Sequence, residues 1–339
     1  MERKLASIQR ILALEPIEGA DFIERATVQG WSCVTRKGEF KVGYLCVYFE
    51  IDSMLPERDE FEFMKPRGMR VKTIRLKGQI AQGLALPIKK MGLNINYLQE
   101  GDDVTGILGV KKYLRPGDKE ARAKLNGYAK GTLPGFFRKT DEFRIQSYPK
   151  LLDDMAGMEV YQTTKLDGSS MSVYYNDKID EPFGVCSRNL NLKEDDQNSF
   201  WKVANQYNLR DKLTQLGVNI VVQGELCGPG VQHNPLELDD LDVYIFNAYY
   251  LDEGRYADLD ELVSICNRLG LKTVPIEKTY TFSHSLSSIL EEAKGKYEGT
   301  KNPREGIVVR PCKSQLSPRL GYALLSMKCV SNDYLLKEK

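Results

Sequence analysis

The stretch TTKLDGSSMSVYY, residues 163–175, places Lys165 two residues before Asp167 and follows them with a glycine and two serines. On both sides of this group, polar and apolar residues alternate as they do in β-strands. Taken alone, a lysine at the start of a turn is a solvated surface charge paired with the nearby carboxylate. Whether Lys165 takes part in a reaction therefore depends on which other residues of the chain lie near it.

The sequence after Leu151 predicts a domain of mixed strands and helices. The candidate strands are MEVYQTTKL, SMSVYY, GVCSR, NIVVQGELCG, DVYIFNAYYL and GIVVRP. Most are continuous apolar runs, which indicates strands buried on both faces. NSFWKVANQYNLRDKLTQLG and DLDELVSICNRLG each predict a helix, the second with Asp258 as N-cap and Gly270 as C-terminal glycine. We expect an α+β domain over residues 141–339.

Residues 1–110 predict a different architecture, a small β-barrel. The run ATVQGWSCVTRKGEFKVGYLCVYFEIDSMLP contains three candidate strands, punctuated by glycines at hairpin positions. A second β-rich run, RVKTIRLKGQIAQGLALPI, follows it. Several short strands in one small domain are typical of a closed barrel, and the OB-fold is the commonest example that binds nucleic acids.

The segment between the two domains, residues 111–140, is basic. Residues 111–139 hold nine Lys and Arg against two acids, and four aromatic residues are interleaved: Tyr113, Tyr128, Phe136 and Phe137. Such a segment can follow phosphates and stack on bases. A solvated linker rich in Gly and Pro explains the same composition, and the sequence leaves both interpretations open.

Composition excludes several classes of protein. Seven cysteines without a C-x-x-C pair favour free thiols in a reducing, intracellular compartment. With only two histidines, a His-ligated metal site or a Ser-His-Asp triad is not expected. No apolar run approaches the roughly 20 residues that span a bilayer, so we expect no membrane partner. The net charge of +1 excludes binding of nucleic acid by bulk charge alone.

Charged residues recur at the ends of the predicted strands of the second domain. In chain order they are Lys165, Asp167, Arg188, Glu225, Glu305 and Lys328. An unpaired charge beside a buried strand is costly, so charges of both signs are expected to meet in one polar site. There a lysine amine could attack an α-phosphate, and carboxylates could hold the metal that neutralises a triphosphate.

The order of these residues resembles the motifs of the covalent nucleotidyltransferases, the superfamily of DNA ligases, RNA ligases and mRNA capping enzymes. The matches are KLDG (165–168) to motif I, SRN (187–189) to motif Ia, the strands of Glu225 and Phe246 to motifs III and IIIa, EGIVVR (305–310) to motif IV, and SMK (326–328) to motif V. A lone K-x-D-G recurs by chance. Six elements in the superfamily's order are specific.

Because the barrel candidate precedes the second domain, the chain resembles ATP-dependent RNA ligases with an N-terminal OB domain, RNA ligase family five. This resemblance implies an OB-like barrel followed by an antiparallel-sheet nucleotidyltransferase domain of ligase type, related to ATP-grasp folds. It implies an enzyme that uses ATP and Mg²⁺ or Mn²⁺ to join a 3′-hydroxyl to a 5′-phosphate. The implied partner is a nicked duplex with an RNA 3′-hydroxyl end, and the implied oligomeric state is a monomer.

The resemblance also implies a role for each matching residue. Lys165 would be the nucleophile that forms a lysyl-adenylate, and Lys328 would contact the α-phosphate. Arg188 and Ser170 would lie near the ribose or the attacking 3′-hydroxyl. The carboxylates around the metal would be Asp167, Glu225 and Glu305.

Four further positions would bind the nucleotide. Phe246 would stack on the adenine, with Val308 opposite it. The backbone around Thr164 would read the edge of the base. Arg144 would contact the outer phosphates.

Motif V departs from many relatives, which carry two lysines spaced K-x-K. This chain has Ser326 in place of the first lysine. Arg310 or Lys313 could supply the missing charge, and the sequence does not decide between them.

Three other functions are compatible with parts of this pattern. A DNA ligase or an mRNA capping guanylyltransferase shares the motifs, but both typically carry their OB domain after the catalytic domain. An OB-type RNA-binding protein with an inactive second domain is the third alternative. The presence of Lys165, Glu225 and Glu305 argues against it.

Overall fold

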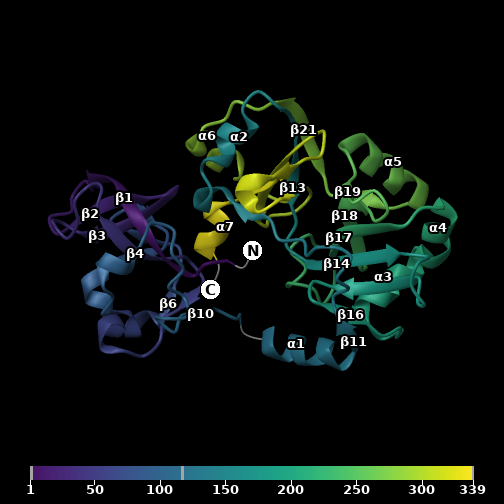
Figure 1. Cartoon of the computed structure of the whole chain (residues 1–339), viewed down its shortest axis with the longest axis horizontal. Coiled ribbons are helices and arrows are strands. Elements are labelled where there is room, and N and C mark those ends of the chain that lie inside the picture. Colours follow the sequence, from purple (N-terminus) through teal and green to yellow (C-terminus); the bar gives the residue numbers. More distant parts are fainter. Residues whose placement is uncertain (1–2, 116–117, 338–339) are drawn as a thin grey trace. The chain divides into compact units, whose positions relative to one another are not determined.

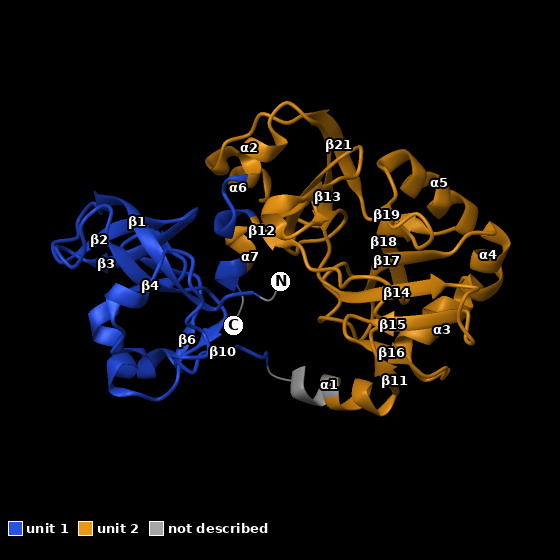
Figure 2. Ribbon diagram, viewed as in Figure 1, with its two compact units in different colours: residues 1–116, 145–150, 335–339 blue, residues 117–144, 151–334 orange. Residues whose placement is uncertain are grey.

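The computed structural model describes residues 3–115 and 118–337, which form two compact units (Figure 2). Unit 1 comprises residues 1–116, 145–150 and 335–339, and unit 2 comprises residues 117–144 and 151–334. The basic segment expected between the domains is shared by both units. It contains β10 (Lys111–Lys112), α1 (Asp118–Gly127) and β11 (Ala129–Thr132). Residues 116 and 117 of this segment lie outside the described residues.

Unit 1 is built on a curled antiparallel sheet with the strand order β3–β2–β1–β4–β9 (Figure 1). Its strands are β1 (Ala6–Pro16), β2 (Ile23–Val28), β3 (Trp31–Arg36), β4 (Leu45–Phe49) and β9 (Leu84–Pro87). The long strand β1 pairs with β4 through residues 6–10 and with β2 through residues 11–16. A register shift between Ile11 and Ala13 bends β1 where it changes partner, which curls the sheet.

The inner face of this sheet buries the core of unit 1. Ile8, Val47 and Phe49 pack there, and the rings of Phe49 and Phe61 meet edge to face with centroids 5.5 Å apart. Shorter strands and helices complete the unit: β5 (Ser53–Met54), β6 (Arg70–Val71), β7 (Ile74–Leu76), β8 (Gln79–Ala81), η1 (Asp59–Arg67), η2 (Ile88–Met91), η3 (Ile95–Tyr97) and η4 (Ile145–Ser147).

Unit 2 is built on a larger and a smaller sheet. The larger has the order β11–β16–β15–β14–β17–β18–β19, with β20 beside β18. Its further strands are β14 (Ser169–Tyr175), β15 (Phe183–Ser187), β16 (Leu190–Leu192), β17 (Ile220–Cys227), β18 (Asp242–Tyr250), β19 (Arg255–Tyr256) and β20 (Lys272–Thr273). Except for β18 with β20, its strand pairs are antiparallel.

The smaller sheet of unit 2 has the order β12–β25–β22–β13–β21. Its strands are β12 (Phe143–Arg144), β13 (Glu159–Lys165), β21 (Ile276–Thr281), β22 (Gly306–Pro311) and β25 (Met327–Val330). A separate ladder joins β23 (Leu316–Ser317) to β24 (Ala323–Leu324). The predicted strands of the second domain therefore all form, but they divide between two sheets.

Helices α3 (Ser199–Gln206), α4 (Leu209–Leu216) and α5 (Leu259–Leu269) pack on the larger sheet (Figure 1). The prediction of one helix over NSFWKVANQYNLRDKLTQLG is wrong, because Asn208 adopts a left-handed conformation with φ 50° and separates α3 from α4. The prediction for α5 is confirmed. Asp258 is its N-cap, with its N–H donating to Glu261 Oε2 at 2.8 Å, and Gly270 ends it at φ 66°.

The remaining helices are α2 (Leu151–Met155), α6 (Leu286–Glu292), α7 (Asn332–Lys337) and η5 (Pro318–Leu320). Within residues 3–115 and 118–337, none of the helices is long and apolar enough to cross a membrane. The seven cysteines, all in the described part of the chain, are free thiols. This agrees with the absence of a disulfide framework expected from their spacing.

Candidate active site

Strand register places four of the predicted site residues on one face of the smaller sheet. Thr163 lies opposite Val308, Val308 opposite Lys328, and Arg144 beside Lys328. Residues directly across a ladder share a face, and so do residues two apart on one strand. Lys165, two residues after Thr163, therefore projects from the same face as Val308, Lys328 and Arg144.

Lys165 and Glu305 form a largely buried ion pair at one end of this sheet. The Nζ of Lys165 lies 2.6 Å from Oε2 of Glu305, with the two side chains 20% and 17% exposed. Burial lowers the pKa of Lys165, but the carboxylates of Glu305, Glu225 and Asp167 outweigh it and leave that pKa above its usual value. Lys165 is thus an ammonium held by carboxylates.

Glu225 reaches the same place from the larger sheet. Strand β17 pairs Glu225 with Ser170 of β14, and the Gly168 N–H donates to Glu225 Oε1 at 3.1 Å. Burial raises the pKa of Glu225 to about 7, an effect that Lys165 opposes and Glu305 reinforces. Three carboxylates therefore lie near one lysine at a site that is partly shielded from solvent.

The glycine of the KLDG motif is required by the close approach of two strands. A Cβ at Gly168 would lie 2.4 Å from the carbonyl oxygen of Leu226. Only glycine lets the turn after Lys165 come close enough to β17 for the bond to Glu225. Asp167, in the same turn, accepts a hydrogen bond from the Tyr334 hydroxyl at 2.6 Å.

Ser326 lies in a buried cluster of hydrogen bonds. It accepts from Arg310 Nε at 3.1 Å and donates to the carboxylate of Glu142, which also pairs with Arg310. Arg310 in addition donates to the carbonyl oxygen of Phe246, and its guanidinium lies 5.5 Å from the centre of that ring. Of the two cations considered as substitutes for a motif V lysine, Arg310 contacts Ser326. Lys313 instead pairs with Asp258 at 3.0 Å, and its side chain is 80% exposed.

Other predicted site residues make different contacts. The Thr164 hydroxyl donates to Glu277 at 2.7 Å, on the opposite face of β13 from Lys165. Ser170 Oγ lies 2.5 Å from Thr140 Oγ1. Arg188 pairs with Asp141, and both side chains are about half exposed.

Sequence reasoning missed two residues that organise this region. Glu142 holds Arg310 and Ser326, and burial of its carboxylate is outweighed by Arg310, so its pKa lies below the usual value. Tyr297 bonds to the backbone around Lys165 and Glu305. Glu142 stands within the segment KTDEFRIQ, and Tyr297 within a polar loop, so neither carries a pattern that would single it out.

A divalent metal fits the chemistry of this donor set. Mg²⁺ and Mn²⁺ prefer oxygen ligands, and Asp167, Glu225 and Glu305 bring more negative charge than Lys165 neutralises. Burial is the main cause of the raised pKa of Glu225, and the neighbouring carboxylates of Glu305 and Asp167 add to it. Among residues 3–115 and 118–337, however, no three His, Cys, Asp or Glu side chains are already gathered as a metal-binding group.

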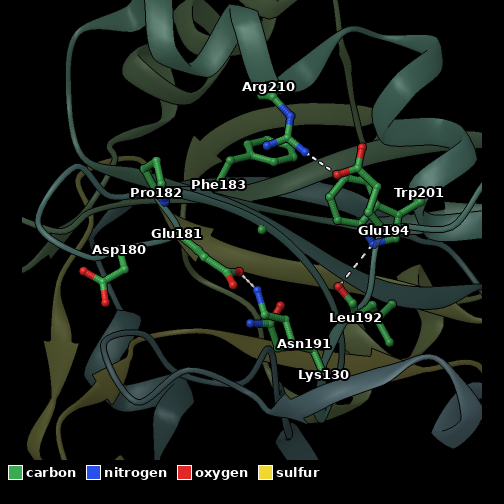
Figure 3. Close-up of a pocket in the computed structure, with 11 residues that line it drawn as sticks. Lys130, Asp180, Glu181, Pro182, Phe183, Asn191, Leu192, Glu194, Trp201 and Arg210 are labelled. Atoms are coloured by element: carbon green, nitrogen blue, oxygen red, sulfur yellow. Dashed lines mark hydrogen bonds and ion pairs between the residues drawn. The ribbon is translucent and has the colours of Figure 1, made fainter.

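A separate pocket of about 280 Å³ opens beside β15 and β16 (Figure 3). Arg210 lies over the ring of Phe183, 4.7 Å from its centre, and pairs with Glu194 at 2.6 Å. Lys130, on another side, pairs with Glu181. The predicted site residues do not line this pocket, whose cations are already paired.

Comparison with known proteins identifies the family. A model of an OB-fold domain matches residues 5–88, and a model of RNA ligase matches residues 158–330. Comparison with curated proteins gives no match. The chain belongs to the RNA ligase family, and unit 1 carries the OB-fold domain that its strand pattern predicted.

Solved structures of an RNA ligase from Naegleria gruberi are similar over nearly the whole chain. A mutant with ATP and Mn is 35% identical with a TM-score of 0.87, covering 98% of each chain. The ligase with PPi and another mutant with ATP and Mn are each 36% identical with a TM-score of 0.88, again covering 98% of each chain. The α+β fold expected for the ligase domain is thereby confirmed.

Proposed function

We propose that this chain is an ATP-dependent RNA ligase that works through a covalent lysyl-AMP on Lys165. The observation that carries the proposal is the largely buried Lys165–Glu305 pair at 2.6 Å, with Glu225 and Asp167 close enough to affect the pKa of Lys165. Similar structures that contain ATP or AMP with Mn support the choice of nucleotide and of a divalent metal.

In the first step, Lys165 Nζ attacks the α-phosphorus of ATP. The Lys165 ammonium first loses one proton to become a neutral amine. The amine then forms the N–P bond, the P–O bond to the β-phosphate breaks, pyrophosphate leaves, and the nitrogen gives up a second proton. Glu305 Oε2, 2.6 Å from Nζ, is positioned to accept the first of these protons. Asp167, Glu225 and Glu305 would hold the Mg²⁺ or Mn²⁺, which when bound supplies positive charge toward the triphosphate.

Residues from both sheets of unit 2 bind the nucleotide in this proposal. Lys328 contacts the α-phosphate and Arg144 the outer phosphates. Phe246 stacks on adenine with Val308 opposite it, and the backbone around Thr164 reads the base edge. Arg310 supports Phe246 by its bond to that residue's carbonyl oxygen.

Two further steps complete the sealing reaction. AMP passes from Lys165 to the 5′-phosphate of a strand, and a 3′-hydroxyl then attacks that phosphate and releases AMP. Ser170 and Arg188 lie near the ribose or this hydroxyl. We propose as substrate a nick in a duplex whose 3′-hydroxyl end is RNA, bound by a monomer with affinity that falls as salt rises. The free thiols favour a reducing compartment inside the cell.

The decisive experiment is covalent labelling. The protein is incubated with α-labelled ATP or GTP and Mg²⁺ or Mn²⁺, denatured and separated on a gel. Label from ATP that disappears in Lys165→Ala supports the proposal, and label from GTP alone would identify a capping-type enzyme. Absence of label with either nucleotide and either metal would refute it. Nicked duplexes that differ only in the sugar at the 3′-hydroxyl end then test the substrate, since equal sealing rates would contradict RNA specificity.

A further inference from the structure

Tyr297 lies in the loop between α6 and β22, and its hydroxyl bonds to three residues of the candidate active site. It donates to the carbonyl oxygen of Lys165 at 3.1 Å. It accepts from the backbone N–H of Asp167 and from that of Glu305, both at 3.1 Å. A phenol offers one donor and two acceptor positions. All three are used on the backbone of this site.

These bonds fall where the strand ladder stops. The pairing of β13 with β22 ends at Lys165 and Gly306. The amides of Asp167 and Glu305 lie just beyond this last pair. Buried backbone N–H groups need an acceptor, and the Tyr297 hydroxyl supplies it in place of another strand pair. The Tyr297 hydroxyl oxygen therefore connects the end of β13, which carries Lys165, to Glu305, which directly precedes β22.

The loop and the ring hold this hydroxyl in place. Tyr297 is 4% exposed and packs with Leu166 and Val274. Its N–H donates to the Asn302 carbonyl at 3.1 Å, and the Asn302 side chain donates to the carbonyl of Pro235 at 2.9 Å. Contacts within its own loop and hydrogen bonds to the candidate active site thus both hold the Tyr297 hydroxyl in place.

We propose that Tyr297 is a positioning residue for formation of the lysyl-adenylate. Its hydroxyl sets the spacing of the Lys165 amine from the Asp167 and Glu305 carboxylates by holding their three backbone segments together. It touches neither nucleotide nor metal. The proposal rests on the function proposed above and adds a residue to it, because small displacements of a reacting group are costly in rate.

The test is Tyr297→Phe, which removes one oxygen and keeps the ring. We expect the rate constant for labelling at saturating ATP to fall by about 10- to 100-fold. The ATP concentration for half-maximal rate should change less than about threefold, because the proposal gives Tyr297 no contact with the nucleotide. Amide hydrogen exchange, measured without ATP or metal, should become faster at Asp167 and Glu305.

A matched control is Tyr207→Phe, because Tyr207 donates to Asp242 Oδ1 at 2.6 Å in the other sheet of the same unit. This control should lower the melting temperature comparably without slowing labelling. Equal slowing in both variants would overturn the proposal. So would an unchanged rate in Tyr297→Phe, or slowing that comes entirely from weaker ATP binding.

Two measurements decide the matter if Tyr297→Phe does not fold. In the wild-type protein, the amides of Asp167 and Glu305 must be protected from exchange. Rapid exchange at both would refute the proposal without any variant. Asn302→Ala, which loosens the loop but keeps the hydroxyl, should slow labelling by less than about tenfold, and no slowing would count against the proposal.

The two proposals fail in different ways. If the wild-type protein takes no label, the proposed function falls, and the rate claim for Tyr297 falls with it. If the wild-type protein is labelled on Lys165 but Tyr297→Phe is labelled equally fast, the function stands and only the role of Tyr297 is refuted.

Discussion

Arg310 donates a 3.1 Å hydrogen bond to Ser326, the residue that stands where many related enzymes have a lysine. Arg310 is 4% exposed and Ser326 2% exposed. Both are bound to the carboxylate of Glu142, and Arg310 is also bound to the carbonyl of Phe246. The guanidinium on β22 therefore connects Phe246 of β18 with Glu142 and Ser326, which directly precede β12 and β25. In the proposed function, Lys328 is then the cation of β25 that contacts a phosphate.

Glu142→Gln should strongly destabilise unit 2. The change removes the negative partner of a guanidinium that stays buried, and breaking such a pair costs about 3–5 kcal/mol in free energy of unfolding. Urea or thermal unfolding measures the loss. As the control, Asp154→Asn removes the partner of the exposed Arg319 and should change stability very little. Similar losses in the two variants would contradict the burial argument.

The same carboxylate predicts how stability depends on pH. The pKa of Glu142 lies below its ordinary value of 4.5 because Arg310 outweighs the effect of burial. A carboxyl group with a lowered pKa in the folded state stabilises the protein above its unfolded-state pKa, and this contribution is lost as pH falls through the folded value. Below pH 4.5, wild-type stability should therefore fall more steeply than that of Glu142→Gln. If the stability of the wild-type protein and that of Glu142→Gln fall equally with pH, the pKa of Glu142 is not lowered in the folded state.

Ser326→Lys restores the K-x-K pattern of related enzymes, but we expect it to impair this one. A long cation would enter a site that is 2% exposed and already contains Arg310. The melting temperature should fall and labelling of Lys165 should not become faster. A faster labelling rate with unchanged stability would show that the buried cluster can rearrange and free a cation for the phosphates.

Gly168→Ala should abolish labelling or reduce it severely. The added Cβ would lie 2.4 Å from the carbonyl oxygen of Leu226, so the turn after Lys165 must move away from Glu225. Gly135→Ala is the control, because its Cβ would have no atom within 4 Å. Labelling that is normal in Gly168→Ala would show that the close approach of this turn to β17 is unnecessary.

Much of the fold was predictable because it rests on local patterns. Alternation and apolar runs located the strands, and the cap residues Asp258 and Gly270 located both ends of α5. The break at Asn208 was missed because the residues around it continue a helical pattern. A single residue in the left-handed conformation hardly changes the helical spacing of the apolar residues around it.

The candidate site was predictable only in part. The order of the motifs anticipated that Lys165, Glu225 and Glu305 would meet, since each lies on or beside a strand. Tyr297 was missed because it acts through backbone atoms, which any sequence provides. Glu142 was missed because its two partners are far away in the chain and the sequence does not show which face of a sheet they share.

The turn from Lys165 to Ser169 also connects the smaller sheet of unit 2 to the larger one. Strand β13 and Glu305 belong to the smaller sheet, whereas β14, which begins at Ser169, and Glu225 belong to the larger. If the sheets shift against each other, Glu305 travels with the lysine and Glu225 does not. Such a shift would change the charge around Lys165 without breaking the ladder of β13 with β22.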